Sequence, residues 1–184
     1  GKSARFRATA LREGGENASY SREFAFSKST GRPAVLNTKP NDSYTFEGAS
    51  LLVDGYHSRP VFTSGAWLGD LDEPLDVTID MGGDQSYRSV ELETLAEKGD
   101  WIFPPSSVTV WVSDNGTDFT EVASVTVPEA KAGDADGIGR YRMQFPETSA
   151  RYLKVVAQNA AAIPAWHPGA GSKGFLFVDE VVVE

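Results

Sequence analysis

The side chains most able to do chemistry in this chain are carboxylates that gather in two short segments. Asp70 lies near Asp72 and Glu73, and Asp134 lies near Asp136. Hydrolysis of a glycosidic bond needs two carboxyl groups at a fixed separation, one of them with a raised pKa. Both segments are polar and flanked by glycine or proline, as solvated turns are, and no hydrophobic pocket is evident that would raise a pKa. The sequence therefore argues against an autonomous active site.

Other catalytic patterns are missing as well. The chain has two histidines, His57 and His167, and no cysteine, which excludes thiolate catalysis, disulfides and sulfur-ligated zinc. It contains no Gly-x-Ser-x-Gly, His-Glu-x-x-His or phosphate-cradling glycine loop. Residues 134–137 resemble the start of a calcium loop, but the next positions are Ile138, Gly139 and Arg140 rather than oxygen ligands. We predict a turn there.

Three residues suit the recognition of a sugar. A sugar ring has an apolar C–H face and a rim of hydroxyls, so its site needs a flat aromatic flanked by planar or charged hydrogen-bonding groups. Trp166 and His167 lie in a loop rich in proline and glycine between residues 159 and 174, and Trp101 begins a strand after a loop. Aromatic side chains in loops are more often exposed. Two alternatives stay open: Trp101 covers the core, and His167 only pins its loop to a backbone carbonyl.

A second group of candidate ligand residues, Tyr56, His57 and Arg59, crowds one early loop. The remaining two tryptophans receive no binding role. We predict Trp67 to be a core residue, and Trp111 alternates with valines on a strand.

Strand signals recur every ten to fifteen residues, and helix signals are scarce. Alternation of apolar and polar residues, rich in Val, Thr and aromatics, is typical of half-buried strands. The one helix candidate, residues 90–98, fits a strand equally well. Many short strands with Gly and Pro turns predict an all-β sandwich or barrel. The predicted strands are 6–11, 22–26, 75–80, 108–113, 122–127, 141–145, 152–156, 175–178 and 181–183.

Turn residues divide these strands. Asn115 and Gly116 tolerate the positive φ of a tight hairpin. Residues 115–117, Asn-Gly-Thr, also match the glycosylation motif, but we prefer the hairpin turn as the interpretation. Residues 29–33 indicate a linker. The chain opens almost inside a strand pattern without a signal peptide, as an excised fragment would.

Composition limits the partners. The chain has 184 residues and a net charge of −9, so it repels polyanions and a nucleic-acid partner is not expected. No apolar run is long enough to span a membrane, and no amphipathic helix is evident.

Several segments resemble one family in their order and spacing. They are LLVDG at 51–55 followed by Trp67 and VTIDMG at 77–82, then VWVSDNGTDF at 110–119, ARYLKV at 150–155 and FVDEVVV at 177–183. They are similar to the discoidin or coagulation-factor-5/8 type C domain, whose fold family 32 carbohydrate-binding modules share. The resemblance implies a discoidin-like (galactose-binding-like) antiparallel jelly roll over residues 45–184. It would follow a linker over 29–44 and a strand pair over 1–28 from a preceding β-rich domain.

A narrower resemblance concerns WIFPP at 101–105 and PAWHPGAG at 164–171. These segments look like the C-terminal region of bacterial β-N-acetylhexosaminidases (chitobiases) of glycoside hydrolase family 20, whose catalytic barrel would lie upstream.

The resemblance also implies one structural calcium ion. Domains of this kind hold it with the aspartate of an Asp-Gly motif and a glutamate near the last strand, here Asp54 and Glu180. Carbonyl ligands would come from Leu51, Tyr56 and Asp179. Arg59 stands where the family usually has a hydroxyl residue. The alternative is a salt bridge from Glu180 to Arg59, with Asp54 capping its own turn.

The resemblance implies non-catalytic binding of a glycan of terminal N-acetylhexosamine or galactose type. The domain would be a monomeric accessory module of a periplasmic, cell-surface or secreted glycosidase, beside that enzyme's catalytic domain. The alternative is a structural module that packs on the catalytic domain and binds no sugar.

Overall fold

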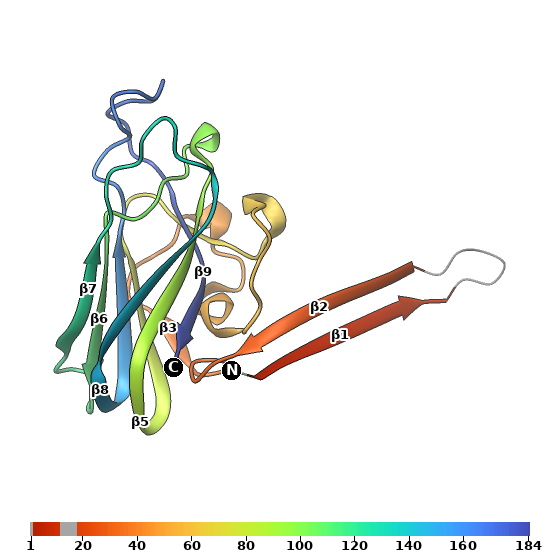
Figure 1. Cartoon of the computed structure of the whole chain (residues 1–184), viewed down its shortest axis with the longest axis vertical. Helices are drawn as coiled ribbons and strands as arrows, with labels where there is room; N and C mark the ends of the chain where they lie inside the picture. Colours follow the sequence, from red (N-terminus) through yellow and green to blue (C-terminus); the bar gives the residue numbers. More distant parts are fainter. Residues whose placement is uncertain (1, 12–17) are drawn as a thin grey trace.

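The computed structural model describes residues 2–11 and 18–184 of the chain (Figure 1). Its strands are β1 Lys2–Ala10, β2 Ala18–Phe26, β3 Ala34–Leu36, β4 Leu68–Asp70, β5 Leu75–Ala96, β6 Ser107–Ser113, β7 Thr120–Thr126, β8 Gly137–Gln158 and β9 Leu176–Val183. The helical segments are short 3-10 turns: η1 Asp42–Tyr44, η2 Gly48–Val53, η3 Phe62–Ser64 and η4 Lys98–Asp100. No helix in the described part of the chain has the length and apolarity needed to cross a membrane.

Two long strands, β5 and β8, build both layers of an antiparallel sandwich. Their first paired stretch runs from Leu75↔Ala157 to Asp80↔Tyr152, and β6, β7 and β3 extend that layer. After two irregularities they pair again from Ser89↔Gln144 to Ala96↔Gly137, and β9 and β4 extend the second layer. The predicted all-β sandwich is confirmed, and the ambiguous segment 90–98 lies mostly in β5.

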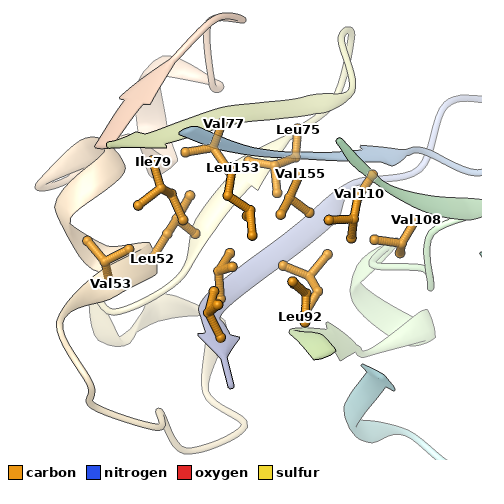
Figure 2. Packing of buried hydrophobic residues seen from close by; sticks show 14 of the residues in the cluster. Leu52, Val53, Leu75, Val77, Ile79, Leu92, Val108, Val110, Leu153 and Val155 are labelled. Atoms are coloured by element: carbon orange, nitrogen blue, oxygen red, sulfur yellow. The ribbon is translucent and has the colours of Figure 1, made fainter. Parts of the chain in front are cut away.

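The core fills the space between the layers (Figure 2). Alternate residues of a strand share a face, so Leu75, Val77 and Ile79 of β5 point inward together. Leu153 and Val155 of β8 meet them there. Trp67 is fully buried in a second cluster with Leu95, Ile102 and Phe177, as the sequence predicts for a core residue.

The N-terminal strand pair forms a separate ribbon that projects from the sandwich (Figure 1). Strands β1 and β2 pair antiparallel from Lys2↔Phe26 to Ala10↔Ala18. Residues 12–17, between these two strands, lie outside the described residues.

The segment 29–44, expected to be a linker, is largely built into the domain. Its strand β3 pairs with β5 from Ala34↔Ile79 to Leu36↔Val77, and Ser29 Oγ donates a buried hydrogen bond to the Val181 carbonyl. A three-residue strand is too short to show periodicity, so the sequence alone does not reveal β3.

The hairpin between β6 and β7 has the predicted turn. Gly116 has φ +75°, and the Asn115 side chain accepts hydrogen bonds from the N–H groups of Thr117 and Asp118. These contacts account for the Asn-Gly pair without invoking glycosylation.

Candidate functional site

Trp101 and Trp166 come together at one end of the sandwich. Trp101 follows η4, and Trp166 lies in the long loop between β8 and β9. Their exposed fractions are 42% and 40%, whereas Trp67 is inaccessible. Two large indoles left half-exposed on neighbouring loops are unusual for packing residues and suit a ligand platform.

His167 lies between the two tryptophans and is itself buried. Its ring is edge-on to Trp101, Phe103 and Trp166, with centroid distances of 5.5–6.1 Å. Nδ1 accepts a hydrogen bond from the Gly169 N–H at 3.0 Å, so Nε2 carries the proton and donates to the Lys98 carbonyl at 2.9 Å. Both ring nitrogens are engaged within the protein, which is the arrangement expected of a residue that pins its loop.

Trp101 is held in an uncommon backbone conformation. Its φ of +64° lies in the left-handed region, which non-glycine residues rarely adopt and which recurs at ligand sites. Its indole lies directly on the backbone of Gly169, where an added Cβ would come within 2.8 Å of the ring. The position therefore requires glycine for close approach of ring and backbone.

Trp166 is anchored differently. Its Nε1–H donates to the Ala130 carbonyl at 2.9 Å, which joins the β8–β9 loop to the loop after β7. Lys98 closes the same end, because its buried ammonium binds the Asp134 carbonyl and the Asp136 carboxylate. That hydrogen bond to Lys98 lowers the pKa of Asp136. The predicted turn at 134–137 is thus tied to the platform.

Beside Trp166 lies an apolar cavity of about 400 Å³ that sequence reasoning missed. It joins three loops, with Glu129 as its one ionisable residue. The lining residues are Phe103, Pro104, Pro105, Ser106, Thr126, Val127, Pro128, Glu129, Ala130 and the run 160–165. The available signal was that run, Ala-Ala-Ala-Ile-Pro-Ala, which is too apolar for an ordinary loop.

Among the described residues, no hydrogen bond, ion pair or ring contact joins the second predicted group, Tyr56, His57 and Arg59, to Trp101 or Trp166. Tyr56 instead meets the ribbon: its ring lies 5.9 Å from that of Phe24, and the Arg22 guanidinium lies 4.1 Å from its centroid. The Arg59 carbonyl accepts the Trp67 Nε1–H at 2.9 Å.

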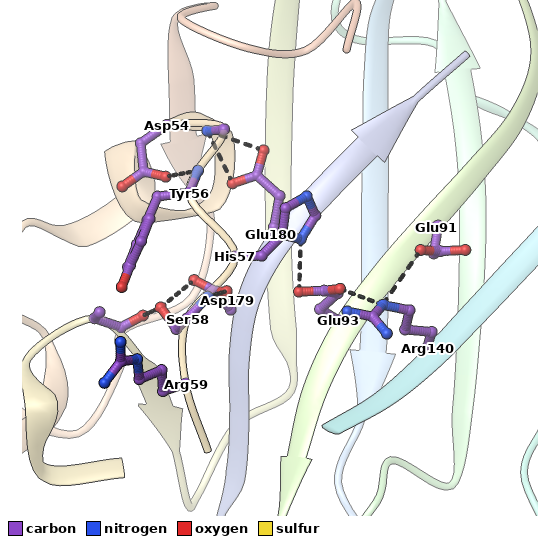
Figure 3. Close-up of polar contacts among 12 residues, drawn as sticks. Asp54, Tyr56, His57, Ser58, Arg59, Glu91, Glu93, Arg140, Asp179 and Glu180 are labelled. Carbon is purple, nitrogen blue, oxygen red and sulfur yellow. Dashed lines mark hydrogen bonds and ion pairs between the residues drawn. The ribbon is translucent and has the colours of Figure 1, made fainter. Parts of the chain in front are cut away.

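His57 belongs to a charged row across the outer face of β5 and β8 (Figure 3). Its Nδ1 lies 2.8 Å from a carboxylate oxygen of Glu93, which is fully buried and also pairs with Arg140. The contact with Glu93 raises the pKa of His57. Burial opposes ionisation of Glu93, but His57 and Arg140 outweigh it and lower its pKa.

The carboxylates expected around a calcium ion lie near one another beside β9 (Figure 3). Asp54 accepts the Tyr56 N–H at 2.6 Å and so caps its own turn, while Glu180, fully buried, faces the Gly55 N–H at 3.2 and 3.3 Å. The Asp179 side chain accepts the Ser58 N–H at 2.7 Å. No ion pair joins Glu180 to Arg59 within residues 2–11 and 18–184.

Burial raises the pKa of Glu180 to about 10, and nearby Asp54 and Asp179 add to the effect. Burial likewise raises the pKa of Asp179 to about 7. No described cationic side chain forms an ion pair with Asp54, Asp179 or Glu180, and such a set of oxygen donors suits a hard cation chemically. As arranged, however, no three acidic or histidine side chains in the described chain form a ready cation cage.

The fold and site together define a class: a β-sandwich that presents exposed aromatics on its end loops. Residues 36–173 match the profile of the F5/8 type C domain. The chain belongs to this family. A comparison with curated proteins found no match.

Solved structures extend the comparison. One similar structure is CpGH89CBM32-5 from Clostridium perfringens, solved in complex with GalNAc-β-1,3-galactose. Its TM-score is 0.58 at 16% identity, over 86% of this chain and 99% of that one. Another is chitosan-binding module 1 from the chitosanase/glucanase of Paenibacillus sp. IK-5, with TM-score 0.55 at 18% identity, over 86% and 98% of the chains. At these identities the likeness establishes a shared fold.

Proposed function

We propose that this domain is a non-catalytic module that binds a glycan across Trp101 and Trp166. The observation that carries the proposal is their joint, half-exposed placement on loops that His167, Lys98 and Gly169 hold rigid. Rigid aromatics lose little entropy on binding and suit the C–H face of a sugar. His167 acts here by positioning the rings, and Tyr56, His57 and Arg59 would contact only a glycan that extends beyond the platform.

The glycan we expect is of terminal N-acetylhexosamine or galactose type. Two similar folds support a sugar ligand, since one was solved with GalNAc-β-1,3-galactose and another is named a chitosan-binding module. One or two stacked rings with a few exposed hydrogen bonds give a binding free energy of about −4 to −6 kcal/mol, which corresponds to a millimolar to high-micromolar Kd.

The parent chain we propose is a periplasmic, cell-surface or secreted glycosidase, of the β-N-acetylhexosaminidase (chitobiase) type. The two segments that carry this resemblance lie together in the fold, because Trp101 packs on Gly169 and the Phe103 ring faces His167.

The module itself would be monomeric. One calcium ion held by Asp54 and Glu180, with carbonyls of Leu51, Tyr56 and Asp179, would tie the early loop to β9.

Titration with N-acetylglucosamine, N-acetylgalactosamine and galactose, after a glycan array, tests the function. We expect saturable binding that Trp166→Ala weakens about two- to thirteen-fold and that Trp111→Ala, on strand β6, leaves unchanged. A folded protein that binds none of these glycans contradicts the proposal.

The ribbon favours a second candidate function, docking onto a neighbouring catalytic domain. Ala4, Phe6 and Ala8 of β1 share one face with Tyr20, Arg22 and Phe24 of β2, so this face is apolar except for Arg22, and Phe6 is 62% exposed. An isolated two-stranded ribbon is marginal in water, so an apolar face of this kind suits a packed partner. Loss of activity of the parent enzyme on Phe6→Ser, with glycan binding intact, would separate this role from the first.

A further inference from the structure

A buried carboxylate outside the sites described above has no partner. Asp70 ends β4 and is 1% exposed, yet neither of its carboxylate oxygens receives a hydrogen bond from any residue that the structure describes. An unpaired buried carboxylate costs several kcal/mol. Its retention calls for a compensating group.

The direction of the Asp70 side chain follows from strand pairing. Leu68 pairs with Val178 and Asp70 pairs with Leu176, so these four side chains share one face of the β4–β9 ladder. Leu68, Leu176 and Val178 belong to the main core. Asp70 therefore points between the two layers, at the end of the sandwich.

A second buried oxygen without a partner belongs to Asn159, whose side chain contacts the Asp70 backbone. Asn159 follows β8, and its Nδ2 donates to the carbonyls of Asp70 and Leu71 at 3.2 and 3.3 Å. These two acceptors fix which side of the amide is nitrogen. Its Oδ1 is then a buried acceptor that also lacks a partner among the described residues.

The cationic side chains of this region are already engaged. Lys173 pairs with Asp72 at 2.6 Å, and Lys39 pairs with Asp42 at 2.7 Å. In the part of the chain that the structure describes, the buried side-chain atoms of this region that lack a partner are oxygen acceptors. A single water could donate only two hydrogens and would bring no charge, whereas a hard cation suits a set of oxygen ligands.

We propose that Asp70 and Asn159 form a binding site for a hard cation of calcium type, with both Asp70 carboxylate oxygens and Asn159 Oδ1 as side-chain ligands. The site is distinct from the calcium position proposed at Asp54 and Glu180, because Leu176, opposite Asp70, lies four residues before Glu180 on β9. The bound ion would tie β4 to the end of β8, and so join the two layers at this end of the sandwich.

Burial, with a smaller contribution from Glu73, raises the pKa of Asp70 to about 7. Protons therefore compete with the cation near neutrality, and the test belongs at pH 8.

The experiment uses calcium alone as the probe and the Glu180→Gln protein as the background, which removes the other proposed site. After chelator treatment, calcium is titrated by calorimetry and by thermal unfolding. We expect one calcium per chain, with a Tm increase of roughly 5–10 °C at calcium about 100-fold above Kd. Adding Asp70→Asn should abolish both signals.

Asp72→Asn is the matched control, because Asp72 follows Asp70 by two residues but is exposed and paired with Lys173. It should keep the calcium response. Without calcium, Asp70→Asn should be at least as stable as its background, since the change removes an unpaired buried charge. The proposal is overturned if the Glu180→Gln protein binds no calcium, or if its binding survives Asp70→Asn.

Discussion

The platform depends on a glycine that a single methyl group can test. Gly169 lies under Trp101, and in Gly169→Ala the new Cβ would come within 2.8 Å of ring atom Cζ2 and 3.0 Å of Cη2. Carbon atoms prefer separations of about 3.5–4.0 Å, so the indole must move away by roughly 0.5–1 Å. Trp101 is half-exposed, so the ring has solvent into which it can move.

The magnitudes follow from that freedom. Overpacking in a closed core costs about 1–3 kcal/mol, and an outward-moving ring should stay at the low end, near 1 kcal/mol. Loss of one well-placed stacking ring should cost about 0.5–1.5 kcal/mol of binding free energy, which raises the glycan Kd about two- to thirteen-fold. We therefore expect an affinity defect with little loss of stability.

Gly99→Ala provides the control, because an added Cβ there meets no atom within 4 Å although the residue is only two positions from Trp101. Calorimetric titration with the best glycan and thermal unfolding should be run on both variants. If Gly169→Ala binds as tightly as the wild type and its tryptophan fluorescence is unchanged, the packing argument for Trp101 is wrong.

Three further predictions concern stability. Arg151 holds the pKa of Asp80 at about 2 in the folded protein, against about 3.9 in the unfolded chain. This ion pair therefore stabilises the fold above about pH 4, and its contribution is lost as the pH falls toward 2. In urea unfolding, Asp80→Asn should lose less stability than the wild type over that window, and parallel losses would contradict the assignment. Trp67→Ala should lower the free energy of unfolding by about 3–5 kcal/mol, because it empties a core position and leaves the Arg59 carbonyl without its hydrogen-bond donor. A loss below about 1 kcal/mol in the same assay would show that the surrounding core collapses into the space. His167→Ala should lower the free energy of unfolding by about 2–4 kcal/mol, without a blue shift in the fluorescence emission of Trp101 or Trp166. A stability equal to that of the wild type would mean that the two hydrogen bonds of His167 do not hold the loop.

Much of the fold could be predicted because strands that bury one face repeat every two residues. The alternation at 75–80, 108–113 and 152–156 was sufficient to locate strands of the sandwich. The same rule left 90–98 ambiguous, because apolar and polar residues alternate from Val90 to Glu93 but Leu95 falls out of step, after the irregularity of β5 between Leu92 and Thr94. Strand β3 was too short to have a period.

The site was predictable only where local sequence determines exposure. Trp101 and Trp166 follow from their loop context, and the structure leaves both exposed. The cavity beside Trp166 and the contact of Trp101 with Gly169 depend on loops that meet only in the folded chain. Tyr56, His57 and Arg59 could not be placed from sequence, because their neighbours come from the ribbon and from β5.

The central claim, that glycan binds across Trp101 and Trp166, can be measured through the indole N–H signals. The chain has four tryptophans, so a ¹⁵N-labelled sample should give four such resonances in a two-dimensional NMR spectrum. Titration with N-acetylglucosamine oligomers or GalNAc-β-1,3-galactose should shift the Trp101 and Trp166 signals. The buried Trp67 and the strand residue Trp111 should stay in place. Saturable shifts confined to Trp67 or Trp111, or no indole shift while the glycan binds, would contradict the account.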